Sequence, residues 1–295
     1  MEMHVCFLVI LEINLMNSYE KANVNKFYFD LKNQDNNARY GEIKTAWGNI
    51  DTPAFMPVGT AATVKAMLPE SIKSTGAQII LANTYHLMLR PGEKIINKYS
   101  GVRNMMGWDG PLLTDSGGYQ VMSLSSLREL NNNGVKFRSH LDGSEYILTP
   151  EISTNLQRTF DATISMVFDE CTKFPCSFEE AEASMYLSMD WAERSKKAFK
   201  EKNGYAQFGI VQGSIYKKLR EVSAEILKNL NFDGYAVGGL AVGEGQNLMF
   251  DVLDFTCPIL PKEKPRYLMG VGKPSDIVGA VARGIDMFDC VLPTR

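Results

Sequence analysis

The sequence has few of the residues that build metal sites and disulfide frameworks. Its 295 residues include three histidines and five cysteines, and no two cysteines form a Cys-x-x-Cys pair. The odd number of cysteines gives no disulfide framework, and no cluster of His and Cys has the spacing of metal ligands. The sequence therefore predicts no metal site and favours a reducing, cytoplasmic compartment.

Basic charge and long apolar runs are also scarce. The net charge is −3, so a polyanionic partner would have to meet a local basic patch. The apolar stretch 5–15 contains Glu12 and Asn14 and lacks the positive start and cleavage site of a signal peptide. It is also too short to span a bilayer. We expect no membrane partner, and we expect residues 1–25 to form a poorly ordered extension.

The remaining composition is that of a globular protein, with 45% hydrophobic and 22% charged residues. Its length allows one large α/β domain or two smaller ones. Before the main run of elements, the strand-like stretches 27–31 and 42–45 flank a turn at 34–37. We predict a hairpin there that covers one end of a single domain, residues 26–295.

Short apolar segments recur along this domain and alternate with amphipathic helical stretches. Helices are predicted at 68–74, 150–160, 214–230 and 274–284, and a capping box at Ser177 opens one of about 25 residues. Eight strands alternating with helices predict a (β/α)8 TIM barrel. An open doubly wound sheet is the alternative, but no Gly-x-Gly-x-x-Gly follows the first strand. The predicted strands are 54–59, 78–83, 112–114, 164–168, 207–211, 235–237, 266–269 and 287–292.

The stretch 108–148 is longer than a barrel connection and reads as an insertion between the third and fourth strands. Its strand-like segment 135–138 is easily miscounted as a barrel strand.

Polar side chains and glycines recur where these apolar strands stop. Because all strands of a barrel end at one face, and catalytic groups stand there, these residues predict an active site. For Asp115 alone, an Asp that hydrogen-bonds its own turn is an equally good interpretation. The strand ends carry Asn83, Asp115, Asp169, Gln212, Gly238, Gly239, Gly270 and Asp289.

At these strand ends the chain resembles the tRNA-guanine transglycosylases, the queuosine-pathway tRNA-ribosyltransferases. The motifs follow in family order from about residue 40 to the end: Asn83-Thr84-Tyr85-His86-Leu87, Asp115-Ser116-Gly117-Gly118-Tyr119-Gln120-Val121-Met122, Phe168-Asp169-Glu170-Cys171, Gly209-Ile210-Val211-Gln212-Gly213, Gly238-Gly239-Leu240-Ala241-Val242-Gly243-Glu244, Leu268-Met269-Gly270-Val271-Gly272 and Phe288-Asp289-Cys290-Val291-Leu292-Pro293-Thr294-Arg295.

The resemblance implies a barrel followed by a zinc-binding subdomain. The family's Cys-x-Cys-x-x-Cys and distal His ligands lie beyond the Pro-Thr-Arg motif, where this sequence stops. We therefore expect a barrel without its eighth helix and without the zinc subdomain, and no zinc ligands in this chain. The resemblance also implies a homodimer for the full-length enzyme.

The resemblance further implies that guanine at the wobble position of tRNA is exchanged for 7-aminomethyl-7-deazaguanine (preQ1), as in the bacterial enzymes. By match, Asp289 is the nucleophile that holds the ribose covalently, and Asp115 is the general acid/base. The alternative for Asp289 is a structural carboxylate, since Asp286 lies nearby; an unpaired charge inside an apolar strand is costly, which favours a functional Asp289.

Recognition of the base requires hydrogen bonds to its Watson–Crick edge and a stacking surface. The resemblance implies that Asp169 accepts hydrogen bonds from the ring N–H and the amino group, and that Gln212 and the Gly239 N–H donate to the carbonyl. It also implies that Tyr119 and Met269 cover the two faces of the ring. Taken singly, a capping Asp, a surface Gln and core packing explain these residues as well. The remaining predicted base-pocket residues are Ser116, Gly117, Gly118, Cys171, Gly238, Leu240 and Ala241.

A tRNA partner also requires phosphate-binding groups. A glycine-rich turn at a helix start suits a backbone phosphate. A second basic stretch, made of Arg194, Lys196, Lys197, Lys200 and Lys202, is equally well explained as a solvated helix face. The predicted tRNA-binding residues are Gly270, Val271, Gly272, Lys273, Pro274, Ser275, Asp276, Thr294 and Arg295.

Two other functions stay open from the sequence. One is a barrel hydrolase that cuts a nucleoside or glycosidic bond with Asp115 and Asp289. The other is a non-catalytic tRNA-binding subunit, which should lack the nucleophile.

Overall fold

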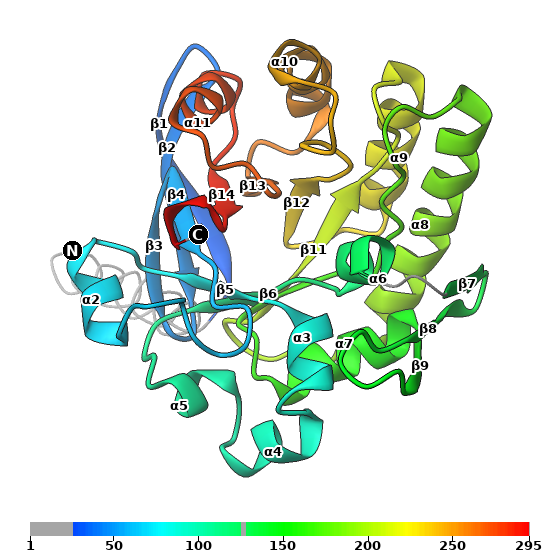
Figure 1. Ribbon diagram of the computed structural model, residues 1–295. Helices are drawn as coiled ribbons and strands as arrows, with labels where there is room; N and C mark the ends of the chain where they lie inside the picture. Colours follow the sequence, from blue (N-terminus) through cyan, green and yellow to red (C-terminus); the bar gives the residue numbers. More distant parts are fainter. Residues whose placement is uncertain (1–25, 125–127, 295) are drawn as a thin grey trace, which may run out of the picture.

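The computed structural model describes residues 26–124 and 128–294 (Figure 1). The predicted extension 1–25 and the predicted tRNA-binding Arg295 lie outside these residues. No helix in the described part of the chain is long and apolar enough to cross a membrane.

The centre of the molecule is a ring of eight parallel strands, which confirms the predicted (β/α)8 barrel. Their order is β4-β14-β13-β12-β11-β10-β6-β5, and a parallel bridge between Val58 and Leu81 joins the two ends of the sheet. The strands are β4 (Ala54–Pro57), β5 (Ile80–Ala82), β6 (Leu112–Thr114), β10 (Ile164–Met166), β11 (Ala206–Val211), β12 (Gly234–Val237), β13 (Arg266–Leu268) and β14 (Met287–Cys290).

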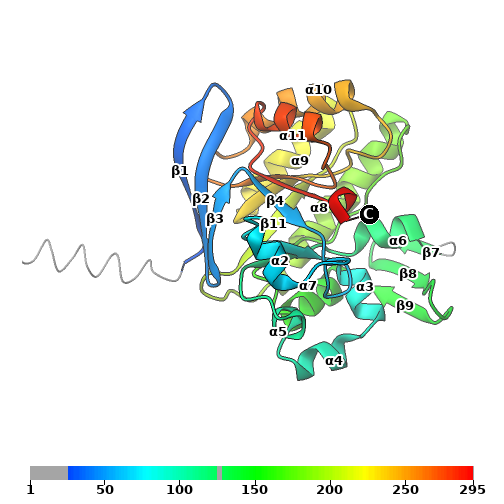
Figure 2. The same cartoon turned by 60° about the vertical axis from the view of Figure 1, so that its left-hand side comes forward.

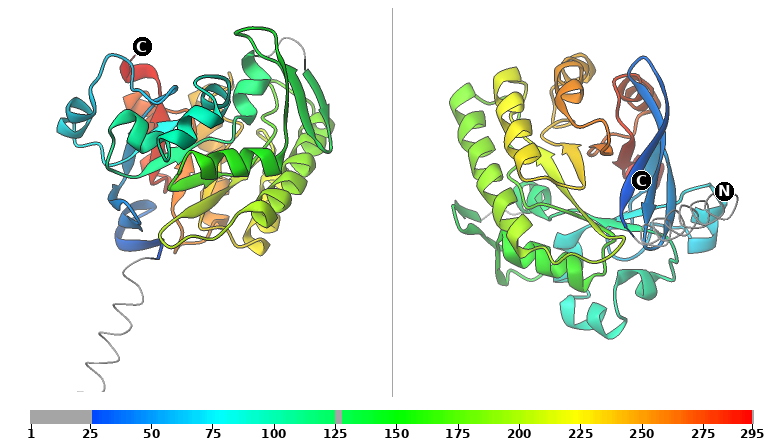
Figure 3. Two further views of the ribbon diagram at one scale, coloured as in Figure 1. Left: turned by 90° about the horizontal axis from the view of Figure 1, so that it is seen from below. Right: turned by 180° about the vertical axis from the view of Figure 1, so that it is seen from behind.

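Long helices cover the outside of the second half of the barrel. From α7 to α11, successive helices pack side by side around the strands (Figures 1 and 3). Their starts follow the predicted caps: Thr149 Oγ1 accepts the N–H of Ile152 at 3.2 Å, and Ser177 forms a capping box with Glu180. The helices are α7 (Pro150–Thr159), α8 (Phe178–Ala198), α9 (Lys217–Asn229), α10 (Gln246–Thr256) and α11 (Pro274–Val281).

The first half of the barrel has shorter helices, most of which the apolar pattern did not predict. They hold few residues each, so their hydrophobic periodicity is too brief to read from the sequence. They are α2 (Pro69–Ser74), which was predicted, and α3 (Thr84–Leu89), α4 (Glu93–Lys98), α5 (Val102–Met106) and α6 (Gly118–Leu124). The 3-10 turns η1 (Cys257–Ile259) and η2 (Leu292–Thr294) follow α10 and β14.

The predicted insertion between the third and fourth barrel strands forms an antiparallel sheet of its own, which the sequence did not predict. It consists of β7 (Arg128–Asn131), β8 (Gly134–Arg138) and β9 (Glu145–Leu148), so the segment 135–138 is not a barrel strand. The carbonyl of Asn132 accepts hydrogen bonds from Trp191 Nε1 at 2.9 Å and from Arg194 Nη1 at 2.7 Å, which fasten the β7–β8 turn to α8.

A second antiparallel sheet precedes the barrel (Figure 2). It contains the predicted hairpin, β1 (Tyr28–Asp35) and β2 (Ala38–Thr45), and a third strand, β3 (Gly48–Thr52), that was not predicted from the sequence. Ala46 N donates to Gly204 O at 3.0 Å, and Arg39 Nη2 donates to the carbonyls of Lys262 and Lys264. Because these acceptors precede β11 and β13, the sheet covers the amino-terminal end of the barrel.

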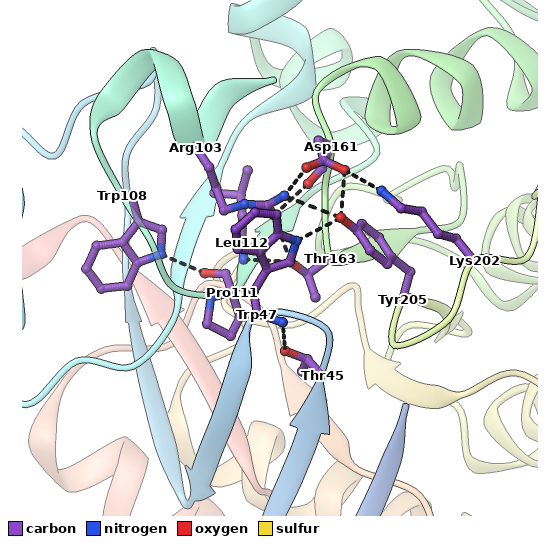
Figure 4. Close-up of polar contacts among 10 residues, drawn as sticks. All are labelled: Thr45, Trp47, Arg103, Trp108, Pro111, Leu112, Asp161, Thr163, Lys202 and Tyr205. Atoms are coloured by element: carbon purple, nitrogen blue, oxygen red, sulfur yellow. Dashed lines mark hydrogen bonds and ion pairs between the residues drawn. The ribbon is translucent and has the colours of Figure 1, made fainter. Parts of the chain in front are cut away.

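The turn between β2 and β3 is held by a polar cluster under the barrel (Figure 4). Trp47 donates from Nε1 to Tyr205 OH at 2.8 Å, and the Arg103 guanidinium lies 3.9 Å from the Trp47 ring centroid. Arg103 and Lys202 both form ion pairs with Asp161. With the amino-terminal end closed in this way, a ligand site is left to the opposite end of the strands.

Candidate active site

A cavity of about 920 Å³ opens at the carboxyl-terminal ends of the barrel strands. It brings together groups that lie more than 170 residues apart, from Asp115 to Asp289. The predicted residues that line it are Asp115, Ser116, Gly117, Tyr119, Asp169, Cys171, Gln212, Gly238, Gly239, Leu240, Ala241, Met269, Gly270, Asp289 and Thr294. Catalytic groups of TIM barrels occupy this end, so the cavity is the candidate active site.

Asp115 follows β6 directly and is held by the loop after β5. Asn83 Nδ2 donates to Asp115 Oδ2 at 2.6 Å, and the backbone N–H of Thr84 donates to Oδ1 at 2.7 Å. Burial raises the pKa of Asp115 to about 6, against the opposing effect of these hydrogen bonds; the charge of Asp289 raises it further. A carboxyl group with this pKa can both give and take a proton near neutral pH.

Asp169 faces the same cavity from the loop after β10. Gln212 Nε2 donates to its Oδ2 at 2.7 Å, and Ser116 Oγ donates to its Oδ1 at 3.1 Å. Burial raises the pKa of Asp169 to about 6, while these two hydrogen bonds lower it. Asp169 and Gln212 therefore form one hydrogen-bonded pair on the wall of the cavity.

Two glycines are required by close approach around this pair. A Cβ on Gly118 would lie 2.3 Å from the carbonyl oxygen of Asp169, so only glycine fits at the start of α6. Gly239 has a φ of +65°, and a Cβ there would lie 2.5 Å from Gln212 Oε1. Gly118 itself does not line the cavity; it allows Asp169 to approach the loop after β6.

Asp289 lies on β14 and is half-buried at the cavity wall. Its Oδ1 accepts hydrogen bonds from Tyr267 OH at 2.6 Å and from Gly270 N at 2.7 Å. Burial raises the pKa of Asp289, and these two donors oppose the rise. With both donors on Oδ1, no described protein group hydrogen-bonds Oδ2.

Asp286 has a different environment at the other end of β14. It is fully buried and forms an ion pair with Arg39 of β2, with Arg39 Nε 3.1 Å from Asp286 Oδ1. Its Oδ2 accepts the backbone N–H of Arg266 at 2.7 Å. Asp286 thus fastens the amino-terminal sheet to the barrel, away from the cavity.

The predicted stacking residues differ in exposure. Tyr119 on α6 is 52% exposed at the cavity, whereas Met269 after β13 is half-buried. Both side chains are free to contact a planar ligand from the cavity wall.

The predicted tRNA-binding turn lies beside the cavity, but part of it is engaged within the protein. The Gly270 N–H is bound to Asp289, Val271 is buried, and Gln246 Nε2 donates to Ser275 Oγ at 3.2 Å and to Asp276. Lys273, Pro274 and Ser275 are exposed at the start of α11. Gly270 and Thr294 line the cavity, whereas Val271, Gly272, Lys273, Pro274, Ser275 and Asp276 do not.

None of the residues of the second basic stretch lines the cavity. Lys202 pairs with Asp161 under the amino-terminal end, and Lys197 pairs with Glu193. Arg194 forms an ion pair with Glu151, and this pairing lowers the pKa of Glu151 to about 2. These contacts favour the solvated-face interpretation of this stretch over tRNA binding.

Several residues that the structure places in the site had no predicted role. Asn83 and Thr84 hold Asp115, and Tyr267 holds Asp289. Asn83 was visible as a polar strand end. Tyr267 was not, because a Tyr inside an apolar strand looks like core packing. His86 and Lys65 also line the cavity.

The structure also bears on the zinc that the resemblance implies. Within residues 26–124 and 128–294, no group of three or more His, Cys, Asp or Glu side chains is placed to hold a metal ion. The residues described here do not fit a zinc ion.

The raised pKa values of Asp115 and Asp169 predict a stability that depends on pH. An Asp whose pKa is higher in the folded than in the unfolded protein favours folding at acidic pH, and this contribution is lost as the pH rises through about 6. Asp169→Asn should therefore raise the free energy of unfolding at pH 7.5 by up to about 3 kcal/mol and leave it nearly unchanged at pH 3, below the pKa of the unfolded state. Thermal denaturation at both pH values measures this; equal melting temperatures at pH 7.5 would contradict it.

Comparison with known proteins adds the family. The sequence model described as queuine tRNA-ribosyltransferase matches residues 34–295. The chain belongs to the queuine tRNA-ribosyltransferase family. It is 61% identical over 272 residues to the queuine tRNA-ribosyltransferases of Rickettsia bellii, Rickettsia akari and Rickettsia felis, an alignment that covers 92% of this chain and 75% of each relative. The predicted family and the predicted class of enzyme, a glycosyltransferase, are thereby confirmed.

Proposed function

We propose that this chain exchanges the wobble guanine of queuosine-type tRNAs for preQ1 through a covalent bond between Asp289 and the ribose. The observation that carries the proposal is the cavity itself, which places Asp115, Asp289 and the Asp169–Gln212 pair around one space. Two carboxylates with different partners suit a glycosidic bond that is broken and remade with retention.

The hydrogen bonds of Asp289 fit the role of nucleophile. Tyr267 and Gly270 both donate to Oδ1, which fixes the carboxylate and leaves Oδ2 to attack the anomeric carbon. Asp115 then moves the protons: it donates to the ring nitrogen of the departing guanine and accepts a proton from the entering base.

The Asp169–Gln212 pair reads the base. A carboxylate accepts from the ring N–H and amino group of a guanine-like edge, and the Gln212 amide and the Gly239 N–H donate to its carbonyl oxygen. Tyr119 and Met269 cover the two faces of the ring. These hydrogen-bonding and stacking groups would bind guanine and a 7-deazaguanine alike. An exchange reaction requires this, because both bases must bind in the same pocket.

The loop after β12 supports preQ1 as the entering base. Ala241 N donates to Glu244 Oε1 at 2.6 Å, so the Leu240 carbonyl, on the other side of that trans peptide, points away from Glu244. Leu240 and Ala241 both line the cavity, where this carbonyl can accept from a cationic aminomethyl group. The larger queuine should fit less well.

The tRNA lies over the cavity with its phosphates toward the start of α11, where Lys273 and Ser275 are exposed. With tRNA as substrate, we place the enzyme in the cytoplasm.

A homodimer is a further part of this proposal, and sedimentation of the purified protein tests it.

Incorporation of labelled guanine or preQ1 into tRNA that has guanine at the wobble position tests the proposed function directly. Incorporation with release of one unlabelled guanine per event is the expected result. Release of guanine without incorporation would indicate the hydrolase instead, and tRNA binding without either reaction would indicate a binding subunit.

Asp169→Asn should weaken the binding of guanine and preQ1 by roughly 1–3 kcal/mol, because an acceptor that faces a donor edge becomes partly a donor. The affinity for tRNA should change little. Calorimetric titration with each base and filter binding with tRNA separate the two effects. A loss of tRNA affinity with unchanged base affinity would show that Asp169 does not read the base.

A further inference from the structure

Arg220 on α9 is a fully buried cation, and no acidic side chain among the described residues pairs with it. Its side chain is 0% exposed, and none of the ion pairs among the described residues includes it. It donates instead to three backbone carbonyls, those of Ser214, Val211 and Gly238, each at 2.8 Å. Its Nη2 has no hydrogen-bond partner among the described residues.

The guanidinium lies directly behind the wall of the cavity. Val211 and Gly238 flank the carboxyl ends of β11 and β12, next to Gln212 and Gly239. A Cβ added to Gly239 would lie 3.6 Å from Arg220 Nη2. Arg220 therefore joins the two strand ends that present Gln212 and the Gly239 N–H to the cavity.

Arg220 keeps its charge in this position. Burial lowers its pKa to about 10, and Glu244, an acidic group that opposes this, acts through space only. Three carbonyls could be satisfied by neutral donors, so hydrogen bonding alone does not explain an ionised group at 0% exposure. A buried positive charge is favourable when negative charge develops nearby.

We propose that Arg220 is a positioning residue that stabilises the negative charge on the carbonyl oxygen of the departing purine, through the Gly239 N–H and the Gln212 side chain, whose backbone it fastens at Gly238 and Val211. This inference rests on the proposed base exchange.

The step balances without any further reactant. Asp289 Oδ2 forms a bond to the anomeric carbon while the bond from that carbon to the base nitrogen breaks. The electron pair of the broken bond stays on the base and spreads through the conjugated ring to the carbonyl oxygen. The proton from Asp115 then neutralises the base nitrogen. Arg220 would stabilise the transient negative charge on this oxygen in the transition state. It would stabilise a neutral bound base much less, so the effect falls on kcat.

Two variants separate charge from hydrogen bonding. Arg220→Lys keeps the charge and three N–H donors without the planar fork, whereas Arg220→Gln loses the charge and keeps two N–H donors. We expect Arg220→Gln to lower kcat for guanine exchange at least about 100-fold with a KM for guanine within about threefold of wild type. Arg220→Lys should lose about tenfold or less. The melting temperature of each variant shows whether a loss of activity is caused by unfolding of the protein.

Equal kcat for the two variants, or activity that follows melting temperature alone, would overturn the inference. Failure of the proposed function would look different, because the wild-type protein itself would show no base exchange.

An equilibrium measurement needs no turnover. 8-Azaguanine has a ring N–H acidic enough to ionise above neutral pH, so it presents a base anion to the cavity. Arg220→Gln should bind this anion at least about tenfold more weakly than wild type and bind neutral guanine almost equally well. An equal loss for both bases would show that Arg220 only shapes the pocket.

Discussion

Asp289→Asn is expected to abolish base exchange, by at least about 1,000-fold in kcat, while tRNA still binds. An amide of the same shape attacks carbon far more weakly than a carboxylate. It can still accept from Tyr267 and Gly270, which now donate to Oδ1 at 2.6 and 2.7 Å, so the pocket should keep its form. The variant should also fail to give the denaturation-resistant protein–tRNA adduct that wild type forms with tRNA and a base.

Asp115→Asn is the matched control for this experiment. It impairs proton transfer to the leaving base but leaves Asp289 able to attack, so some adduct should form slowly. A denaturing gel of wild type and the two variants with labelled tRNA compares them directly. An adduct with Asp289→Asn and none with Asp115→Asn would reverse the two roles.

Asp286→Ala, at the residue directly before β14, is expected to lower the stability of the fold and leave the chemistry of the active site intact. Removing one partner of a buried ion pair leaves the Arg39 charge uncompensated, which costs about 3–5 kcal/mol. The N–H of Arg266 also loses its acceptor at 2.7 Å. Urea denaturation should show the loss, whereas kcat for base exchange, measured well below the melting temperature, should stay within a few-fold of wild type.

The double variant Arg39→Met/Asp286→Leu tests the cause of that loss. It removes both charges together, so it should recover most of the stability that Asp286→Ala loses. A double variant as unstable as Asp286→Ala would show that the hydrogen bonds of Arg39 to the Lys262 and Lys264 carbonyls, or the packing around Asp286, hold the sheet to the barrel more than the ion pair does. If the Asp286→Ala variant stayed folded and lost base exchange, Asp286 would again be a candidate for the nucleophile.

The predicted barrel rested on particular local signals. Each strand is a short apolar run ended by a polar residue or a glycine, and the caps at Thr149 and Ser177 mark two helix starts. These signals act within a few residues of chain, so they can be read without knowing the fold. The short helices α3 to α6 and the strand β3 escaped because brief segments carry too little periodicity.

The sequence by itself determined the alternation of strands and helices, and with it the face of the barrel where Asp115, Asp169, Gln212 and Asp289 end their strands. Only the tertiary structure revealed the different surroundings of Asp286, which precedes β14 and pairs with Arg39, and of Asp289, which lies on β14 and faces the cavity. It alone revealed Tyr267 and Arg220, because a Tyr in a strand and an Arg on a helix acquire their partners only when distant segments pack together. Local chemistry sets the elements, and burial among distant neighbours sets the charge and the partners of each side chain.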